Sequence, residues 1–286
     1  MKRVLVAGAT GYLGQFVARE FKARGYFVRA LARSPGRLDH MRDSLDEIVQ
    51  GEVTRPETIA HVCDDIDIVF SSIGITKQKD KLTFRDVDYQ GNVNLLKAAQ
   101  QAGVEKFIYV SVFNGPNLLH LDIVKAHEDF VDVLKASGMN HAVLRPTGYF
   151  SDMTEFLQMA KKGRVYLIGD GSNRVNPIHG ADLAVSCVDA AEGERQEVDV
   201  GGPEIMTFRE IAELAFRSLG KPARITAVPA WVMRPVIATT KLFSKHQSEL
   251  LAFFTTAMTS DVVASSTGSH RLEDHFASLC SEGSNQ

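Results

Sequence analysis

The chain has 286 residues, enough for one large α/β domain or for such a domain with a smaller lobe attached. Hydrophobic residues make up 44% of it and charged residues 23%, which is ordinary for a globular protein in water. The net charge of −3, without a block of like charges, gives no support for a nucleic-acid partner, and we expect none.

The cysteines and the apolar runs exclude several other classes. Cys63, Cys187 and Cys280 are too scattered for a metal site or a disulfide framework, so we expect reduced thiols and no metal. The chain opens directly into a predicted strand, which gives no sign of a signal peptide, and no apolar run reaches the length of a membrane span. These features predict a cytoplasmic protein. They do not determine its oligomeric state.

The first residues have the pattern of a strand, a glycine turn and a helix. Residues 2–7 are predicted to form a buried strand, glycines follow at 8, 11 and 14, and apolar residues then recur at helical spacing. Such glycines permit a tight turn, close approach of a pyrophosphate, and close packing of helix on strand, while the helix N-terminus favours phosphate. We therefore predict a dinucleotide site, formed here by Gly8, Thr10, Gly11, Tyr12, Leu13 and Gly14.

The end of the second predicted strand, residues 26–32, indicates which dinucleotide binds. An acidic residue there would bond the ribose 2′-hydroxyl of NAD, but the chain offers Arg33 and Arg37. Guanidinium groups suit a 2′-phosphate, so we expect NADP(H) in preference to NAD(H). For Arg37, a solvated loop charge is the alternative.

Strands and helices continue to alternate through the first half of the chain. Strands are predicted near 47–53, 66–70 and 106–111, and residues 141–150 are predicted to form the sixth strand and its exit, with helices between the strands. This order predicts an α/β fold with a doubly wound parallel Rossmann sheet. The Rossmann domain is expected to span 1–150, its sheet completed by residues 176–201.

The spacing of Gly8, Gly11 and Gly14 resembles the extended and atypical branches of the short-chain dehydrogenase/reductase superfamily, and the resemblance covers most of the chain, weakening after about Thr240. It implies that Glu52 and Val53 meet the adenine. It also implies that a turn after the fourth strand runs along the ribose and phosphates, and that a segment after residue 145 lines the nicotinamide pocket. The residues of these two segments are Ser71, Ser72, Ile73 and Gly74, and Pro146, Thr147 and Gly148.

The catalytic residues of that superfamily are incomplete in this chain. Its reductases use a serine after the fifth strand and a Tyr-x-x-x-Lys motif. Ser111 takes the serine position, or else lies one residue early and leaves Val112 there. Lys125 takes the lysine position, but Leu121 stands where the tyrosine belongs. Lys125 then binds the ribose hydroxyls, acts as a catalytic cation, or only pairs with Asp129. Tyr149 is the phenol that could replace the acid, or else a pocket wall. His127 is expected to be a solvent or packing residue.

A smaller C-terminal α/β lobe is expected from 151–175 and 202–280, with residues 281–286 disordered. Within it, Thr207 and Glu210 have the spacing of a capping box. The apolar segment from Trp231 to Phe254 is expected to be a lid over the substrate pocket, or a helix that contacts a partner or a membrane surface, with Pro235 interrupting the pattern. Lysines at 77, 79 and 81 predict a solvated basic loop.

Two functions fit these features. One is an atypical NADP(H)-dependent oxidoreductase acting on a small apolar molecule without the usual tyrosine. The other is a dinucleotide-binding sensor or accessory protein that docks on a protein partner and performs no turnover, as Leu121 would permit.

Overall fold

The computed structural model describes residues 1–75, 82–194 and 196–282, and the chain forms two compact units, each made of two segments. The first unit comprises Met1–Arg145 and Leu183–Val198. The second comprises Pro146–Asp182 and the chain from Asp199 onward. The lysines at 77, 79 and 81 lie outside the described residues, as do positions 283–286.

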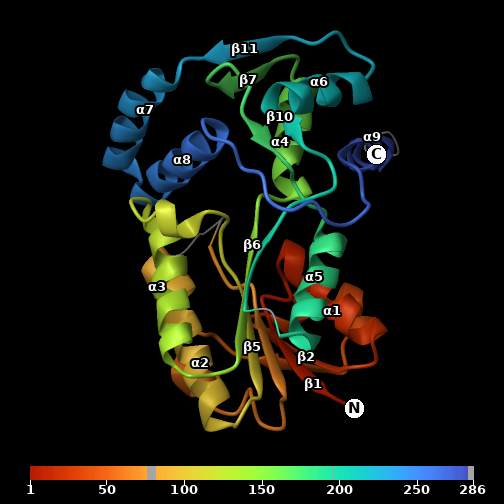
Figure 1. Ribbon diagram of the computed structural model, residues 1–286, viewed down its shortest axis with the longest axis vertical. Helices are drawn as coiled ribbons and strands as arrows, with labels where there is room; N and C mark the ends of the chain where they lie inside the picture. Colours follow the sequence, from red (N-terminus) through yellow and green to blue (C-terminus); the bar gives the residue numbers. More distant parts are fainter. Residues whose placement is uncertain (76–81, 195, 283–286) are drawn as a thin grey trace. The chain divides into compact units, whose positions relative to one another are not determined.

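A seven-stranded sheet organises the first unit (Figure 1). Its order is β3 (Glu47–Gln50), β2 (Phe27–Ala32), β1 (Arg3–Ala7), β4 (Ile68–Ser71), β5 (Lys106–Val110), β6 (His141–Pro146) and β9 (Glu197–Val200). The pairings from β3 to β6 are parallel, with Val4 of β1 opposite Val28 on one side and Ile68 on the other. The strand order reverses at β1, which is where such sheets bind ligands. The predicted doubly wound parallel fold is confirmed.

Helices cover both faces of this sheet. Figure 1 shows α2 (Asn92–Gln101) and α3 (Asp122–Ala136) on one side, and α1 (Tyr12–Ala23) and α5 (Gly180–Glu192) on the other. Strands buried on both faces must be apolar throughout, and Val4, Leu5 and Val6 are fully buried. Shorter turns complete the unit: η1 (Pro35–Ser44), η2 (Pro56–Thr58), the π-helical η3 (Arg85–Gly91) and η4 (Gly115–Asn117).

The second unit has its own core and two small sheets. Its elements are α4 (Phe150–Lys161), β7 (Val165–Ile168), β8 (Arg174–Val175), β10 (Met206–Thr207), α6 (Phe208–Ser218), β11 (Ile225–Val228), α7 (Ala230–Phe243), α8 (Lys245–Met258) and α9 (Leu272–Glu282). β11 pairs with β7 in parallel and β10 with β8 antiparallel. The core is rich in phenylalanine, including Phe150, Phe208 and Phe276.

Two local expectations in this unit need correction. Pro235 does not interrupt the helix that contains it, because α7 continues through it to Phe243. Ser281 is not disordered, since α9 extends to Glu282. Among the residues that the structure describes, none of the helices is both long enough and apolar enough to span a bilayer.

Candidate functional site

The glycine turn after β1 is closely packed. Gly8 has a φ of +100°, and its carbonyl accepts a hydrogen bond from the Gly11 N–H at 2.8 Å. A Cβ on Gly8 would lie 2.7 Å from the Ser72 hydroxyl oxygen, and one on Gly14 would lie 2.2 Å from the Gly8 carbonyl oxygen. Neither position can take a side chain without moving the backbone or its neighbour. The turn therefore has the tight backbone that a pyrophosphate approaches in Rossmann proteins.

Helix α1 begins at this turn in a form suited to an anion. Its N-cap is Gly11, no side chain caps it, and its first turn holds no acidic residue. The first N–H groups of a helix lack partners inside the helix and carry a partial positive charge, which favours phosphate. Leu13 is buried, so it can offer only its backbone N–H there, whereas Thr10 and Tyr12 are half-buried.

The two arginines predicted to select the cofactor are both exposed, directly after β2. The Arg33 carbonyl accepts a 3.3 Å hydrogen bond from the Gln50 side chain of the edge strand β3. The Arg37 N–H donates to the Ser34 carbonyl at 3.1 Å. The backbone at both positions is thus held in place while the guanidinium groups reach the surface at the carboxyl end of β2.

The segments predicted to border the adenine, ribose and phosphates are partly committed to internal bonds. The Ser71 hydroxyl is buried and donates to the Asn92 side chain at 2.6 Å, so it stabilises the turn after β4 from inside the protein. Ser72 is bonded through its N–H to the Ala7 carbonyl and faces Gly8. The Glu52 carboxylate accepts from Thr54 at 3.1 Å, and Val53 is buried.

Ser111 belongs to a buried charge network. Its hydroxyl donates to Glu128 at 2.6 Å, and Arg145 forms two bonds to the same carboxylate at 3.1 and 2.8 Å. Burial alone would lower the pKa of Arg145, but its bonds to Glu128 and Glu197 outweigh that and raise it. Ser111 is therefore placed to fix α3 against the sheet. Sequence analysis overlooked Glu128, although its spacing from Val124 and Val131 sets a carboxylate on the buried face of the helix.

Lys125 is half-exposed, and its ammonium donates to the Asp129 carboxylate at 2.7 Å. This ion pair is the third of the three roles that the sequence left open for Lys125. Burial alone would raise the pKa of Asp129, but the bonds from Lys125 and Arg85 hold it below its ordinary value. Leu121 is the buried N-cap of α3, so the position of the missing tyrosine is filled by an apolar side chain.

A second polar network links three elements of the first unit. The Tyr109 hydroxyl of β5 lies 2.6 Å from Nδ1 of His127 on α3, and Nε2 of His127 lies 3.2 Å from the Asp88 carboxylate on η3. Burial, with Asp88 and Glu128 nearby, raises the pKa of Tyr109 well above its ordinary value. The phenol therefore keeps its proton, and the His127 ring bridges it to Asp88.

Asp88 is the unusual member of this network, which we call the Asp88–His127–Tyr109 chain. It is fully buried, and within the described residues its second carboxylate oxygen has no hydrogen-bond partner. Burial raises its pKa, and the bond with His127 only partly offsets this. A Cβ on the exposed Gly74 would lie 3.0 Å from Asp88 and 3.5 Å from His127. The Asp88–His127–Tyr109 chain therefore borders the segment that was predicted to run along the cofactor.

The expectation for His127 was wrong, because this side chain neither faces solvent nor only packs. Its spacing from Ile123, Phe130 and Leu134 is four, three and seven residues, so it belongs to the buried stripe of α3.

In the second unit, the segment predicted to line the nicotinamide pocket is held by the chain at 176–178. The Thr147 hydroxyl is buried and donates to the Asn176 carbonyl at 2.6 Å, and the Ile178 N–H donates to the Gly148 carbonyl at 2.8 Å. Pro146 is buried, and Tyr149 is half-buried at the N-terminus of α4. The segment thus offers mainly backbone and the Tyr149 ring.

Three histidines gather in the second unit. His179 stacks on His270 with ring centroids 4.2 Å apart, His275 lies edge-on to His179, and Asp182 accepts from His270 at 2.8 Å. Burial, followed by the neighbouring His270 and His275, lowers the pKa of His179 to about 4. Within the described ranges, no cluster of histidine, cysteine or acidic side chains is arranged to hold a metal.

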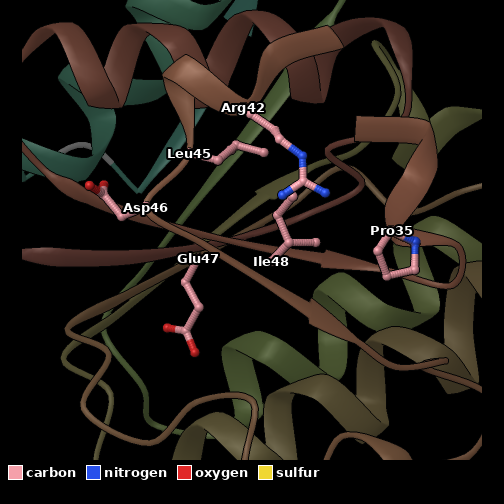
Figure 2. A pocket seen from close by; sticks show the side chains of 6 residues that line it. All are labelled: Pro35, Arg42, Leu45, Asp46, Glu47 and Ile48. Atoms are coloured by element: carbon pink, nitrogen blue, oxygen red, sulfur yellow. The ribbon is translucent and has the colours of Figure 1, made fainter. Parts of the chain in front are cut away.

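A surface pocket lies elsewhere on the first unit, beside the edge strand β3 (Figure 2). It is lined by Pro35, Arg42, Leu45, Asp46, Glu47 and Ile48, none of which was predicted to bind a ligand. Figure 2 shows Glu47 pointing to the opposite side of the strand from Ile48. Its charged groups are paired, for example Asp46 with Lys22 at 2.6 Å, so we assign this pocket no function.

Comparisons with known proteins agree with this geometry. A family model described as NAD(P)H-binding matches residues 8–194. The Photosystem II assembly factor Ycf39 of Synechocystis sp. is 29% identical, covering 88% of this chain and 78% of that protein. The divinyl chlorophyllide a 8-vinyl-reductase of Cucumis sativus is 28% identical, covering 80% of this chain and 60% of that protein.

Solved structures share the fold. The NADPH-dependent quinone oxidoreductase of Escherichia coli superposes with a TM-score of 0.75 at 16% identity, covering 98% of this chain and 100% of the other. The Citrobacter sp. triphenylmethane reductase, complexed with NADP(H), gives 0.76 at 17% identity, covering 98% and 99%. At these identities the likeness shows the fold alone.

Proposed function

The chain belongs to the NAD(P)H-binding family, in the atypical short-chain dehydrogenase/reductase group, and on this premise we propose that it is an NADP(H)-dependent reductase of a small apolar molecule. The observation that carries the proposal is the glycine turn, where side chains at Gly8 and Gly14 would collide with Ser72 and the backbone. When bound, the cofactor supplies a hydride. The relatives include a reductase of a vinyl group, which supports a reduction.

Arg33 and Arg37 carry the preference for NADP(H) in this proposal, because both reach the surface directly after β2 and neither position holds a carboxylate. Glu52, Val53, Ser72 and Gly74 would border the adenine, ribose and phosphates. Lys125 would leave Asp129 to bind the nicotinamide ribose, and Pro146, Thr147 and Gly148 would lie along the nicotinamide.

The test is a titration of the purified protein with NADPH and NADH. We expect NADPH to bind more tightly, and Arg33→Gln to weaken NADPH binding about tenfold, a loss of about 1.4 kcal/mol, while NADH binding is unchanged. Arg42→Gln is the matched control, since Arg42 lies in the neighbouring η1 and pairs with Asp39. Equal binding of both cofactors, or an equal loss for both in Arg33→Gln, would contradict the assignment.

The proton that Leu121 cannot supply needs another source. The sequence offers Tyr149, and the structure adds His127, whose imidazole is held between a phenol and a buried carboxylate beside Gly74. We favour His127, because its ring lies beside Gly74, in the segment that would run along the cofactor. The π-helical turn that carries Asp88 is also a rare form, frequent at functional sites.

The two candidates differ in their effect on the rate of NADPH oxidation, measured with a panel of quinones and conjugated enones. His127→Gln should lower kcat about 100-fold while NADPH affinity stays the same, whereas Tyr149→Phe should leave kcat unchanged. The reverse pattern would assign the role to Tyr149.

An accessory function is the second candidate, favoured by Leu121 and by the relative named as an assembly factor. Tight NADPH binding without oxidation across the whole panel would support it against the reductase. The cytoplasmic location stays a prediction, since several relatives are named as chloroplastic proteins.

A further inference from the structure

Helices α7 and α8 form a hairpin in the second unit, and little of it is buried (Figure 1). α7 has no fully buried residue, and in α8 only Ser248 is buried among the described side chains. This pair of helices therefore packs mainly on itself along one side and offers the other side of α7 to its surroundings.

The exposed side of α7 is a continuous stripe. Its members recur at intervals of three, four and seven residues from Trp231 onward, so they lie on one helical face: Trp231, Arg234, Pro235, Ala238, Lys241 and Leu242. Trp231 is 70% exposed and Leu242 82%, and Phe243, beside the turn into α8, is 90% exposed. Eleven residues separate Trp231 from Leu242, or about 16 Å along the helix. The stripe thus has bulky apolar groups at both ends and cations between them.

The charged residues of the stripe, Arg234 and Lys241, are both cations, and the one acidic residue of the hairpin, Glu249, is half-buried on α8. Between positions 214 and 248 the chain has no aspartate or glutamate, but it has six lysines and arginines, of which Arg234, Lys241 and Lys245 lie in the hairpin. A protein whose net charge is −3 concentrates cations here. Such a surface is complementary to an anionic one.

We propose that the α7 stripe binds flat on an anionic lipid surface, with Trp231, Leu242 and Phe243 entering the boundary between headgroups and acyl chains. Large apolar side chains flanked by lysine and arginine are what such interfacial helices present, and tryptophan favours this depth. A lipid surface accounts for the exposed apolar groups and the cations together. An acidic protein would account for the cations alone. The inference does not depend on the reductase function.

Trp231 provides the measurement, because it is the single tryptophan of the chain. The full-length protein is mixed with vesicles of phosphatidylcholine alone, or of equal parts phosphatidylcholine and phosphatidylglycerol. We expect the emission of Trp231 to shift to the blue, and brominated lipids to quench it, only with the anionic vesicles. Added salt should reverse the shift, since it screens the charges.

Variants test each half of the surface by co-sedimentation with the anionic vesicles. Leu242→Glu with Phe243→Glu should abolish binding. Arg234→Gln with Lys241→Gln should weaken it about 25-fold, since each basic residue near an anionic surface contributes about fivefold. Ile205→Glu is the matched control, because Ile205 is a 52% exposed apolar residue of the same unit outside the stripe, and binding should be unchanged.

Three results would overturn the proposal. One is an unshifted emission with no co-sedimentation on anionic vesicles. The second is an emission that depends on protein concentration without lipid, which assigns the stripe to self-association. The third is an emission that responds to NADPH and not to vesicles, which assigns it to a lid.

Discussion

Single buried carboxylates distinguish this chain at the level of residues. Asp88 has one oxygen without a partner among the described residues, whereas Glu128 uses both oxygens on Arg145. A fully bonded ion pair of this kind fixes the packing around it. A buried carboxylate with one unbonded oxygen keeps a desolvation penalty that no hydrogen bond offsets. The two acids lie forty residues apart in sequence, but Glu128 belongs to α3 and Asp88 contacts His127 of the same helix, so α3 carries both a structural and a candidate functional network.

His179 makes stability depend on pH. Its pKa is about 4 in the folded protein because of burial and of the neighbouring histidines, against an ordinary value of 6.5. The folded state thus favours the neutral ring, so the contribution to stability is present above pH 6.5 and is lost as the pH falls toward 4. His179→Gln should therefore lose less stability over this range, by about 1–2 kcal/mol, since the half-exposed ring is partly screened by water.

Urea unfolding at several pH values between 7.5 and 4.5 measures this difference. His61→Gln is the control, because the His61 side chain is 89% exposed. A constant difference between wild type and His179→Gln over the whole range would contradict the prediction.

At the scale of elements, helix α6 shows how a local pattern becomes structure. Thr207 accepts from the Glu210 N–H at 3.1 Å, and Glu210 accepts from the Thr207 N–H at 2.7 Å, as the capping box in the sequence predicted. We expect Thr207→Ala to lower the free energy of unfolding by about 1 kcal/mol. Ser218→Ala, at the other end of the same helix, is the comparison, and chemical denaturation gives both values. An equal effect of the two substitutions would show that the cap adds nothing.

The alternation of strands and helices was predictable because each element depends on its own local sequence, that is, on the spacing of its apolar residues and on glycine turns. What was not predictable depends on how elements meet. Tyr109, His127 and Asp88 come together only through the packing of β5, α3 and the π-helical η3. In the sequence, Asp88 looks like an ordinary acidic residue in the first turn of a helix, where such residues are common. Pro235 misled for the opposite reason, because the local pattern predicted a break, whereas α7 continues through this sixth helical position and lacks one N–H bond there.

At the scale of the whole molecule, the rate at which each cysteine thiol is labelled measures how often the unit around it unfolds. Cys63 and Cys187 are buried in the first unit, and burial raises the pKa of Cys63 to about 12, whereas Cys280 is half-exposed in the second. We expect an aromatic disulfide reagent to label Cys280 first. The two buried thiols should react only when the first unit opens.

NADPH should slow that opening. At a free concentration one hundred times its dissociation constant, labelling of Cys63 and Cys187 should fall about 100-fold, equivalent to about 2.7 kcal/mol, while Cys280 labels as before. Mass spectrometry of the labelled peptides measures each rate. Rates at Cys63 and Cys187 that ignore NADPH would mean that the cofactor does not stabilise the unit holding the glycine turn.

The last strand of the large sheet has a consequence for synthesis on the ribosome. β9 lies beside β6 in the sheet, yet 50 residues separate Pro146 from Glu197. At ordinary translation rates, β6 is an open edge for on the order of 2–10 s after it emerges. Open edges pair with other chains. A shortened gene ending near residue 150 would keep every glycine of the turn and still leave that edge permanently bare, so its product should aggregate while the full-length chain stays in solution.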